Sequence, residues 1–146
     1  MLETTSEPTK RVAVGAMHPV DEDGDSMQSD FLVDTQATGR AVTLALSGEL
    51  DLVSSPILEE AFERVYETDA ELVIVDLRGL EFMDSTGLHR LVAAQQRAVH
   101  SGRRFGLIRG GEQVQRLFDL TGIAELLRIV DSPEELLEVD QTPGAP

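Results

Sequence analysis

The sequence has 146 residues, 41% hydrophobic and 27% charged, and it carries a formal net charge of −15 without a single cysteine. These values fit one domain with a hydrophobic core, and they exclude a disulfide framework and a thiolate nucleophile. The negative charge argues against partners bound through phosphates, so we expect neither nucleic acid nor an anionic membrane as a partner. Since no apolar run is long enough to span a bilayer or form a signal peptide, we expect a soluble cytoplasmic protein.

Residues 1–29 are predicted to form a flexible acidic tail, because few of them could fill a core. The run Asp21-Glu22-Asp23-Gly24-Asp25 has alternating acids like a calcium loop. However, the glycine stands at the fourth position of that loop, and Leu32 would take the twelfth position, where a bidentate glutamate is needed. We therefore expect a solvated tail, followed by a domain over residues 30–139 and a disordered tail over residues 140–146.

The domain begins with two segments of partly alternating hydrophobicity, Phe31–Thr35 and Ala41–Leu46, which flank a glycine-containing turn and predict a β-hairpin. Ser54 or Ser55 is a plausible N-cap for a helix with Pro56 in its first turn. Residues 71–77 then form a nearly unbroken apolar run, which is typical of a central strand buried on both faces.

The remaining chain alternates helix and strand. A helix is predicted to begin at Asp84-Ser85-Thr86-Gly87 and to end at Ser101-Gly102. A strand over residues 104–108, a helix over 112–120, a short strand over 127–130 and a final helix after Ser132-Pro133 complete the pattern. A hairpin followed by alternating helices and strands predicts an α/β fold, with a mixed β-sheet covered by helices.

The DSTG junction is the most informative motif. Its ordinary role is to start a helix, because side-chain oxygens there accept hydrogen bonds from the free amides of the first turn. The same amides and the positive end of the helix dipole also suit an anion. A phosphoryl group on Ser85 would add about −1.5 to −2 charges at this point, so the junction is chemically suited to a phosphorylation switch.

Three motifs together resemble one family. They are Gly48-Glu49-Leu50-Asp51, the segment from Val75 to Leu88 that contains DSTG, and the segment from Val114 to Gly122. Their order and spacing closely resemble the STAS domain of bacterial anti-sigma factor antagonists, over about residues 31–138. The resemblance implies a mixed sheet with an N-terminal hairpin and with α-helices packed mainly on one face.

The resemblance also implies a non-enzymatic function. The unphosphorylated protein would bind an anti-sigma factor that is also a serine kinase, and would thereby release a sigma factor. In this family the phosphoacceptor is the serine that follows the Asp of the motif, here Ser85. Its phosphorylation would switch the antagonist off, and a metal-dependent serine phosphatase would restore it.

We predict a partner-binding surface made of Asp51, Asp84, Ser85, Thr86, Gly87 and Leu88. Gly87 would permit close backbone approach, and Asp84 would hold the loop or orient the Ser85 hydroxyl. Asp51 and Asp84 could equally be caps, and Thr86 is a rival phosphoacceptor.

Other functions receive less support from the residues. Ser85 lacks the G-x-S-x-G context of a hydrolase nucleophile, and Arg109-Gly110-Gly111 is no Walker loop. The three histidines show no metal-ligand spacing, and we expect no cofactor. The main alternative is a STAS scaffold, or an interaction subunit of a sensory complex or lipid-transport system, without a sigma-factor role.

Overall fold

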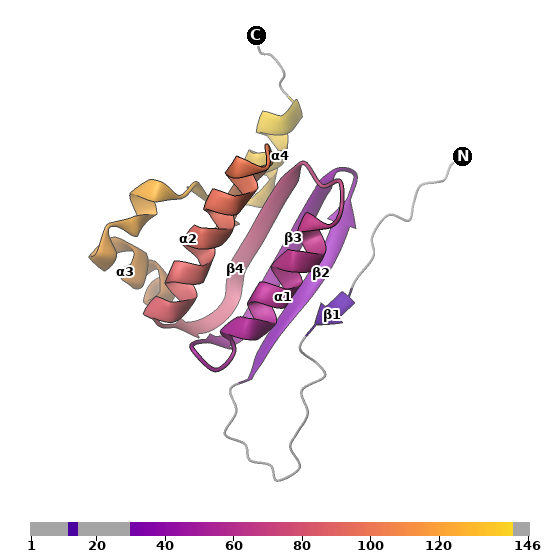
Figure 1. Cartoon of the computed structure of the whole chain (residues 1–146). Coiled ribbons are helices and arrows are strands. Elements are labelled where there is room, and N and C mark those ends of the chain that lie inside the picture. The colour runs from indigo at the N-terminus through magenta and orange to yellow at the C-terminus, as the bar shows by residue number, and fades with distance from the viewer. Residues whose placement is uncertain (1–11, 15–29, 142–146) are drawn as a thin grey trace.

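The computed structural model describes residues 12–14 and 30–141, and within them a six-stranded mixed sheet carries the helices (Figure 1). The elements, in chain order, are β1 Val12–Val14, β2 Phe31–Thr38, β3 Ala41–Leu50, α1 Ser55–Tyr66, β4 Leu72–Met83, α2 Ser85–His100, β5 Arg104–Ile108, α3 Glu112–Thr121, the 3₁₀ helix η2 Ile123–Leu126, β6 Ile129–Val130 and α4 Pro133–Gln141.

The strands follow one another across the sheet in chain order. β1, β2 and β3 pair antiparallel, and β3, β4, β5 and β6 pair parallel. The predicted hairpin is confirmed, with both of its strands extended by several residues. Each parallel pair is joined through a helix, as parallel connections require.

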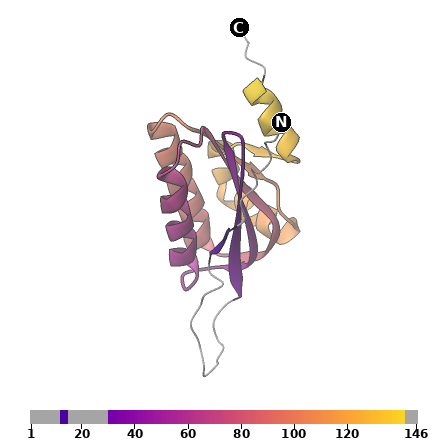
Figure 2. The ribbon, with the colours of Figure 1, turned by 90° about the vertical axis from the view of Figure 1, so that its right-hand side faces the viewer.

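The core is divided between the two faces of the sheet. The larger part lies beneath α1, α2 and α3, and includes Leu58, Leu91 and Phe118. A smaller cluster on the opposite face lies under α4, where Leu136 packs against Gly106. Figure 2 shows α1 and α2 together on one side of the sheet and α4 on the other. The predicted arrangement, with helices mainly on one face, is therefore confirmed.

The predicted boundaries of the domain need correction at both ends. Val12–Val14, which we assigned to the N-terminal tail, pair with residues 33–35 as an edge strand. Pairing between segments far apart in the chain leaves no signal in a three-residue stretch. At the other end α4 reaches Gln141, two residues into the predicted C-terminal tail. The rest of both predicted tails lies outside the described residues.

An irregularity in β3 shapes the end of the sheet that matters for the site. The pairing of β3 with β4 shifts register between Ala45 and Ser47, and again between Gly48 and Glu49. Gly48 has a φ of 92°, and a Cβ there would lie 1.8 Å from the Asp30 carbonyl oxygen. Only glycine fits this position. The irregular strand delivers Glu49, Leu50 and Asp51 to the carboxyl end of the sheet, beside the end of β4.

Candidate functional site

The start of α2 is built on a capped helix terminus. Asp84 occupies the N-cap position, and its Oδ1 accepts hydrogen bonds from the amides of Thr86 (2.9 Å) and Gly87 (3.1 Å). The Leu88 amide donates to the Asp84 carbonyl, as in an ordinary helix. The prediction that DSTG begins a helix is confirmed, and Asp84 acts as its cap.

This cap changes the expected environment of a phosphate. We predicted that the free amides of the helix start would accommodate an anion. In the structure the Asp84 carboxylate already occupies two of those amides, so that part of the prediction is wrong for this conformation. A phosphoryl group on Ser85 would stand next to a carboxylate and remain in solvent, since only the Ser85 amide is left for it.

Ser85 and Thr86 differ in accessibility. Ser85 is exposed, whereas Thr86 is partly buried. Within the described residues, no hydrogen bond engages either hydroxyl. The Ser85 hydroxyl is therefore accessible to a second protein without rearrangement of the helix, and the Thr86 hydroxyl is less so.

Gly87 and Leu88 face inward. A Cβ on Gly87 would lie 2.7 Å from Leu50 Cγ and 2.9 Å from Met83 Cγ, so this glycine allows α2 to pack closely on the sheet. Leu88 is fully buried in the main core. Our expectation that these two residues contact a partner directly does not fit this conformation, because the helix turns them away from solvent. They position the helix end.

Asp51 lies in the loop that follows β3, next to the start of α2. The Asp84 amide donates to the Leu50 carbonyl (3.1 Å), so the two loops adjoin. Asp51 Oδ1 accepts from the Ser54 amide (3.0 Å), and the Ser54 hydroxyl accepts from the Asp51 amide (2.9 Å). The Ser54 hydroxyl also donates to the Glu49 carbonyl (2.8 Å). Asp51 thus holds its loop together. Ser54 occupies the N-cap position of α1 with Pro56 in the first turn, as predicted, but its side chain makes no capping hydrogen bond.

A groove of about 560 Å³ between α1 and α2 is a separate feature, and Ser85 is not part of its lining. Its charged residues pair with one another or with neighbours, as Arg90 does with Glu59 (2.8 Å) and Glu60 with Arg64 (3.2 Å). The Arg97 guanidinium lies 4.3 Å from the centre of the Tyr66 ring. Because these charges are already paired, the groove does not offer an obvious site for an ionic ligand.

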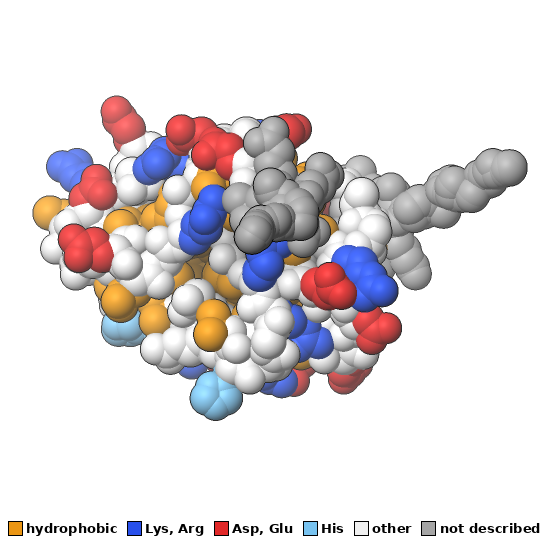
Figure 3. Space-filling model, turned by 90° about the horizontal axis from the view of Figure 1, so that it is seen from above, with side chains coloured by type: hydrophobic (Ala, Val, Ile, Leu, Met, Phe, Trp, Pro, Cys, Tyr) orange, Lys and Arg blue, Asp and Glu red, His pale blue; other side chains and the backbone are white. Residues whose placement is uncertain are grey.

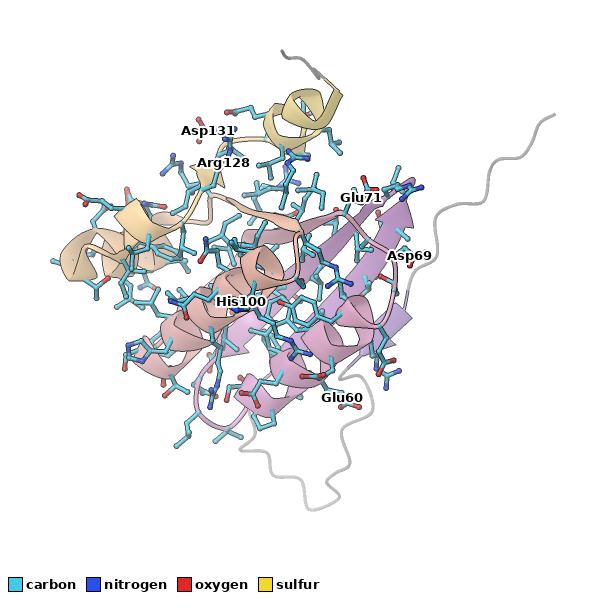
Figure 4. The ribbon with its side chains drawn as sticks, turned by 45° about the horizontal axis from the view of Figure 1, so that its top comes forward. Glu60, Asp69, Glu71, His100, Arg128 and Asp131 are labelled. Carbon is cyan, nitrogen blue, oxygen red and sulfur yellow. The ribbon has the colours of Figure 1, made fainter. Side chains whose placement is uncertain are left out.

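The opposite end of the molecule, where the parallel strands begin, has a mixed surface. Figure 3 shows acidic and basic side chains interspersed there. His100 lies at the C-terminal end of α2, far along that helix from Ser85 (Figure 4). Asp131 and Arg109 directly follow β6 and β5, at the carboxyl ends of those strands, and they form an ion pair (2.8 Å). No group of three or more metal-ligating side chains occurs among the described residues. In the same part of the chain, no helix has the length and apolar composition needed to cross a membrane.

The mixed sheet, the N-terminal hairpin and the capped DSTG helix define a STAS domain. The family model for the STAS domain matches residues 33–136, and the chain belongs to this family. Its relatives include the anti-sigma-F factor antagonist RsfB of Mycobacterium tuberculosis, which is 29% identical over 64% of this chain and 76% of its own length. The anti-sigma-B factor antagonist of Bacillus subtilis is 32% identical over 66% of this chain and 88% of its own length.

Solved structures agree with this fold. A crystal structure of an anti-sigma factor antagonist from Mycobacterium paratuberculosis superposes with a TM-score of 0.68 at 25% identity, covering 79% of this chain and 96% of that one. The unphosphorylated form of SpoIIAA superposes with a TM-score of 0.62 at 20% identity, covering 79% of this chain and all of that one. This chain is therefore homologous to anti-sigma factor antagonists, which are non-enzymatic regulators.

Proposed function

We propose that this protein is an anti-sigma factor antagonist controlled by phosphorylation of Ser85. Its unphosphorylated form binds a cytoplasmic anti-sigma factor that is also a serine kinase, and the sigma factor held by that kinase is released. The observation that carries the proposal is the exposed, unbonded Ser85 hydroxyl at the capped start of α2. The names of the relatives, which are antagonists of anti-sigma factors, support the same partner class.

The physical basis of the switch is local. A protein of net charge −15 gains only about two further negative charges on phosphorylation, and exposed charges are screened within about 8 Å at physiological salt. The overall field of the protein therefore changes little. At the contact itself, however, a hydrated dianion next to the Asp84 carboxylate would have to lose water for a partner to bind. That desolvation penalty opposes binding wherever the partner packs closely on Ser85.

The accessible position of the phosphate also suits its removal. Because the cap leaves a phosphoserine in solvent, a metal-dependent serine phosphatase could reach the group without unfolding the helix. Reversal of the switch would then require no conformational change in the antagonist. Asp51, Asp84 and Thr86, which surround Ser85 at this end, complete the proposed contact surface.

The test is incubation with ATP and purified kinase-type anti-sigma factors from the same genome, read by intact mass. We expect one added phosphate on the wild type and on Thr86→Ala, and none on Ser85→Ala. Release of the sigma factor by the unmodified protein, and not by the phosphorylated one, would complete the assignment. If no candidate kinase modifies or binds the folded wild type, the proposal is wrong, and a STAS scaffold in a sensory or lipid-transport assembly would be favoured.

A further inference from the structure

The loop between β3 and α1 presents two adjacent apolar side chains to water. Leu52 is 68% exposed and Val53 is 70% exposed. Phe82, near the end of the neighbouring strand β4, is 43% exposed. Single exposed apolar residues are common on protein surfaces, but adjacent ones gathered at one end of a domain are typical of an interaction site.

The loop holds these side chains out through internal hydrogen bonds. The reciprocal bonds between Asp51 and Ser54 close it on both sides, and the Ser55 amide donates to the Asp51 carbonyl (2.8 Å). Ser54 is buried at 3% exposure, so the base of the loop is packed against the domain. A partner that covers Leu52 and Val53 would lose little free energy in ordering this backbone.

The loop lies beside the proposed phosphorylation site. The Leu50 carbonyl accepts the Asp84 amide, and the Leu50 side chain packs where Gly87 has no Cβ. Leu52 and Val53 follow Leu50 by two and three residues. Figure 1 shows the β3–α1 loop and the start of α2 at the same end of the molecule.

The surrounding charges indicate the chemistry of the partner. Glu49 and Glu81 are both exposed. Glu49 of β3 pairs with Phe82 of β4, which directly follows Glu81. In the described part of the chain neither carboxylate has a cationic partner. An apolar loop with acidic neighbours is complementary to an apolar surface bordered by Lys or Arg.

We infer that Leu52 and Val53 are the apolar anchor to which the anti-sigma factor kinase binds. The kinase would cover them with an apolar surface that is bordered by Lys or Arg. The inference rests on the proposed function and names the residues that determine affinity for that partner. The anchor and Ser85 belong to one contact surface. The partner buries the apolar side chains of the loop away from water, and phosphorylation adds a hydrated dianion at the edge of that buried area. The same docking would bring the kinase to Ser85.

The test compares a double variant, Leu52→Ser with Val53→Ser, with a matched control in which the exposed Leu120 and Leu126 of α3 and η2 are changed to Ser. Both variants replace two exposed apolar residues and keep the net charge. Affinity for the purified kinase-type anti-sigma factor is measured by calorimetry, and the initial rate of Ser85 phosphorylation is measured below saturation. Thermal unfolding of each variant establishes that it is folded.

We expect the loop variant to bind at least tenfold more weakly and to be phosphorylated correspondingly more slowly, with the control close to wild type. If the wild type binds and the loop variant binds equally well, or if both variants lose affinity alike, the anchor assignment is overturned while the proposed function stands. If the folded wild type neither binds nor is phosphorylated, the proposed function fails and the anchor fails with it.

Discussion

The cap at the start of α2 provides the sharpest test of how the site is built, because one carboxylate oxygen serves two amides. Replacement of Asp84 by Ala removes the acceptor for the amides of Thr86 and Gly87. Loss of an N-cap typically costs about 1 kcal/mol, within a range of about 0.5–2 kcal/mol. For a domain of this size that corresponds to a fall in Tm of about 4 °C.

The amide analogue separates hydrogen bonding from charge. Asn caps helices about as well as Asp, so Asp84→Asn should lose only the interaction of the charge with the helix dipole, a few tenths of a kcal/mol. Glu81→Ala is the matched control, because it removes one exposed carboxylate from the same end of the molecule without removing a cap. Urea unfolding measures the free energies, and amide hydrogen exchange at residues 86 and 87 reports whether the first turn frays. If Asp84→Ala matched the wild type in both measurements, the capping argument would be refuted.

Three further substitutions test other parts of the structure. Arg103→Ala should lower the free energy of unfolding by about 2–3 kcal/mol, because the Arg103 guanidinium donates to the carbonyls of Tyr66, at the end of α1, and of Thr68 and Ala70 just beyond it. Arg103→Lys should not restore this stability, and thermal unfolding of both variants would detect the losses. Gly87→Val should cost about 2 kcal/mol or more, since its Cβ would overlap the buried Leu50; equal stability in urea would contradict the packing. Burial alone would raise the pKa of Asp76, but hydrogen bonds from Arg78 outweigh burial, and the pKa of Asp76 is lowered. Arg78→Ala should therefore raise the pKa of Asp76, which NMR titration of its carboxyl group would show.

The sign of the Asp76 effect on stability follows from the lowered pKa. A carboxyl group that is more acidic in the folded state stabilises the protein above its unfolded pKa, about 3.9. That contribution is lost as the pH falls through the lower, folded pKa. The difference in stability between the wild type and Arg78→Ala should therefore shrink below about pH 4, and a difference that grew in acid would contradict the assignment.

The elements that were predictable from the sequence are those whose signal is local. The helix start at Asp84, the helix end at Gly122 and the hairpin turn at Gly39 all depend on a few adjacent residues. The core strand was also recognised, but β4 continues to Met83, well beyond the predicted end at Leu77. Pairing with the irregular end of β3 holds this extension in the sheet, and such pairing cannot be predicted from the extension alone.

The candidate site divides in the same way. The motif predicted the helix start and its cap, because both depend on adjacent positions, and it proposed Ser85 as the phosphoacceptor. The motif placed Leu88 at the contact, whereas the apolar helical spacing that Leu88 shares with Leu91 predicts a buried face, and the structure buries both. Leu52 and Val53, which we propose as the anchor, had a weak signal: two apolar residues between Asp51 and Pro56 that lie outside the helical pattern.

The geometry of the cap also bears on how a phosphate could act. A phosphoserine that bound the helix amides would have to displace the Asp84 carboxylate, which already accepts from two of them. One anion would then replace another at the same helix start. The helix would gain little from that exchange, because both anions interact favourably with the same amides and the same dipole. The structure of this protein therefore offers little driving force for a conformational switch at this point. The effect of phosphorylation would have to arise in the complex, where a partner cannot cover Ser85 and leave its phosphate hydrated.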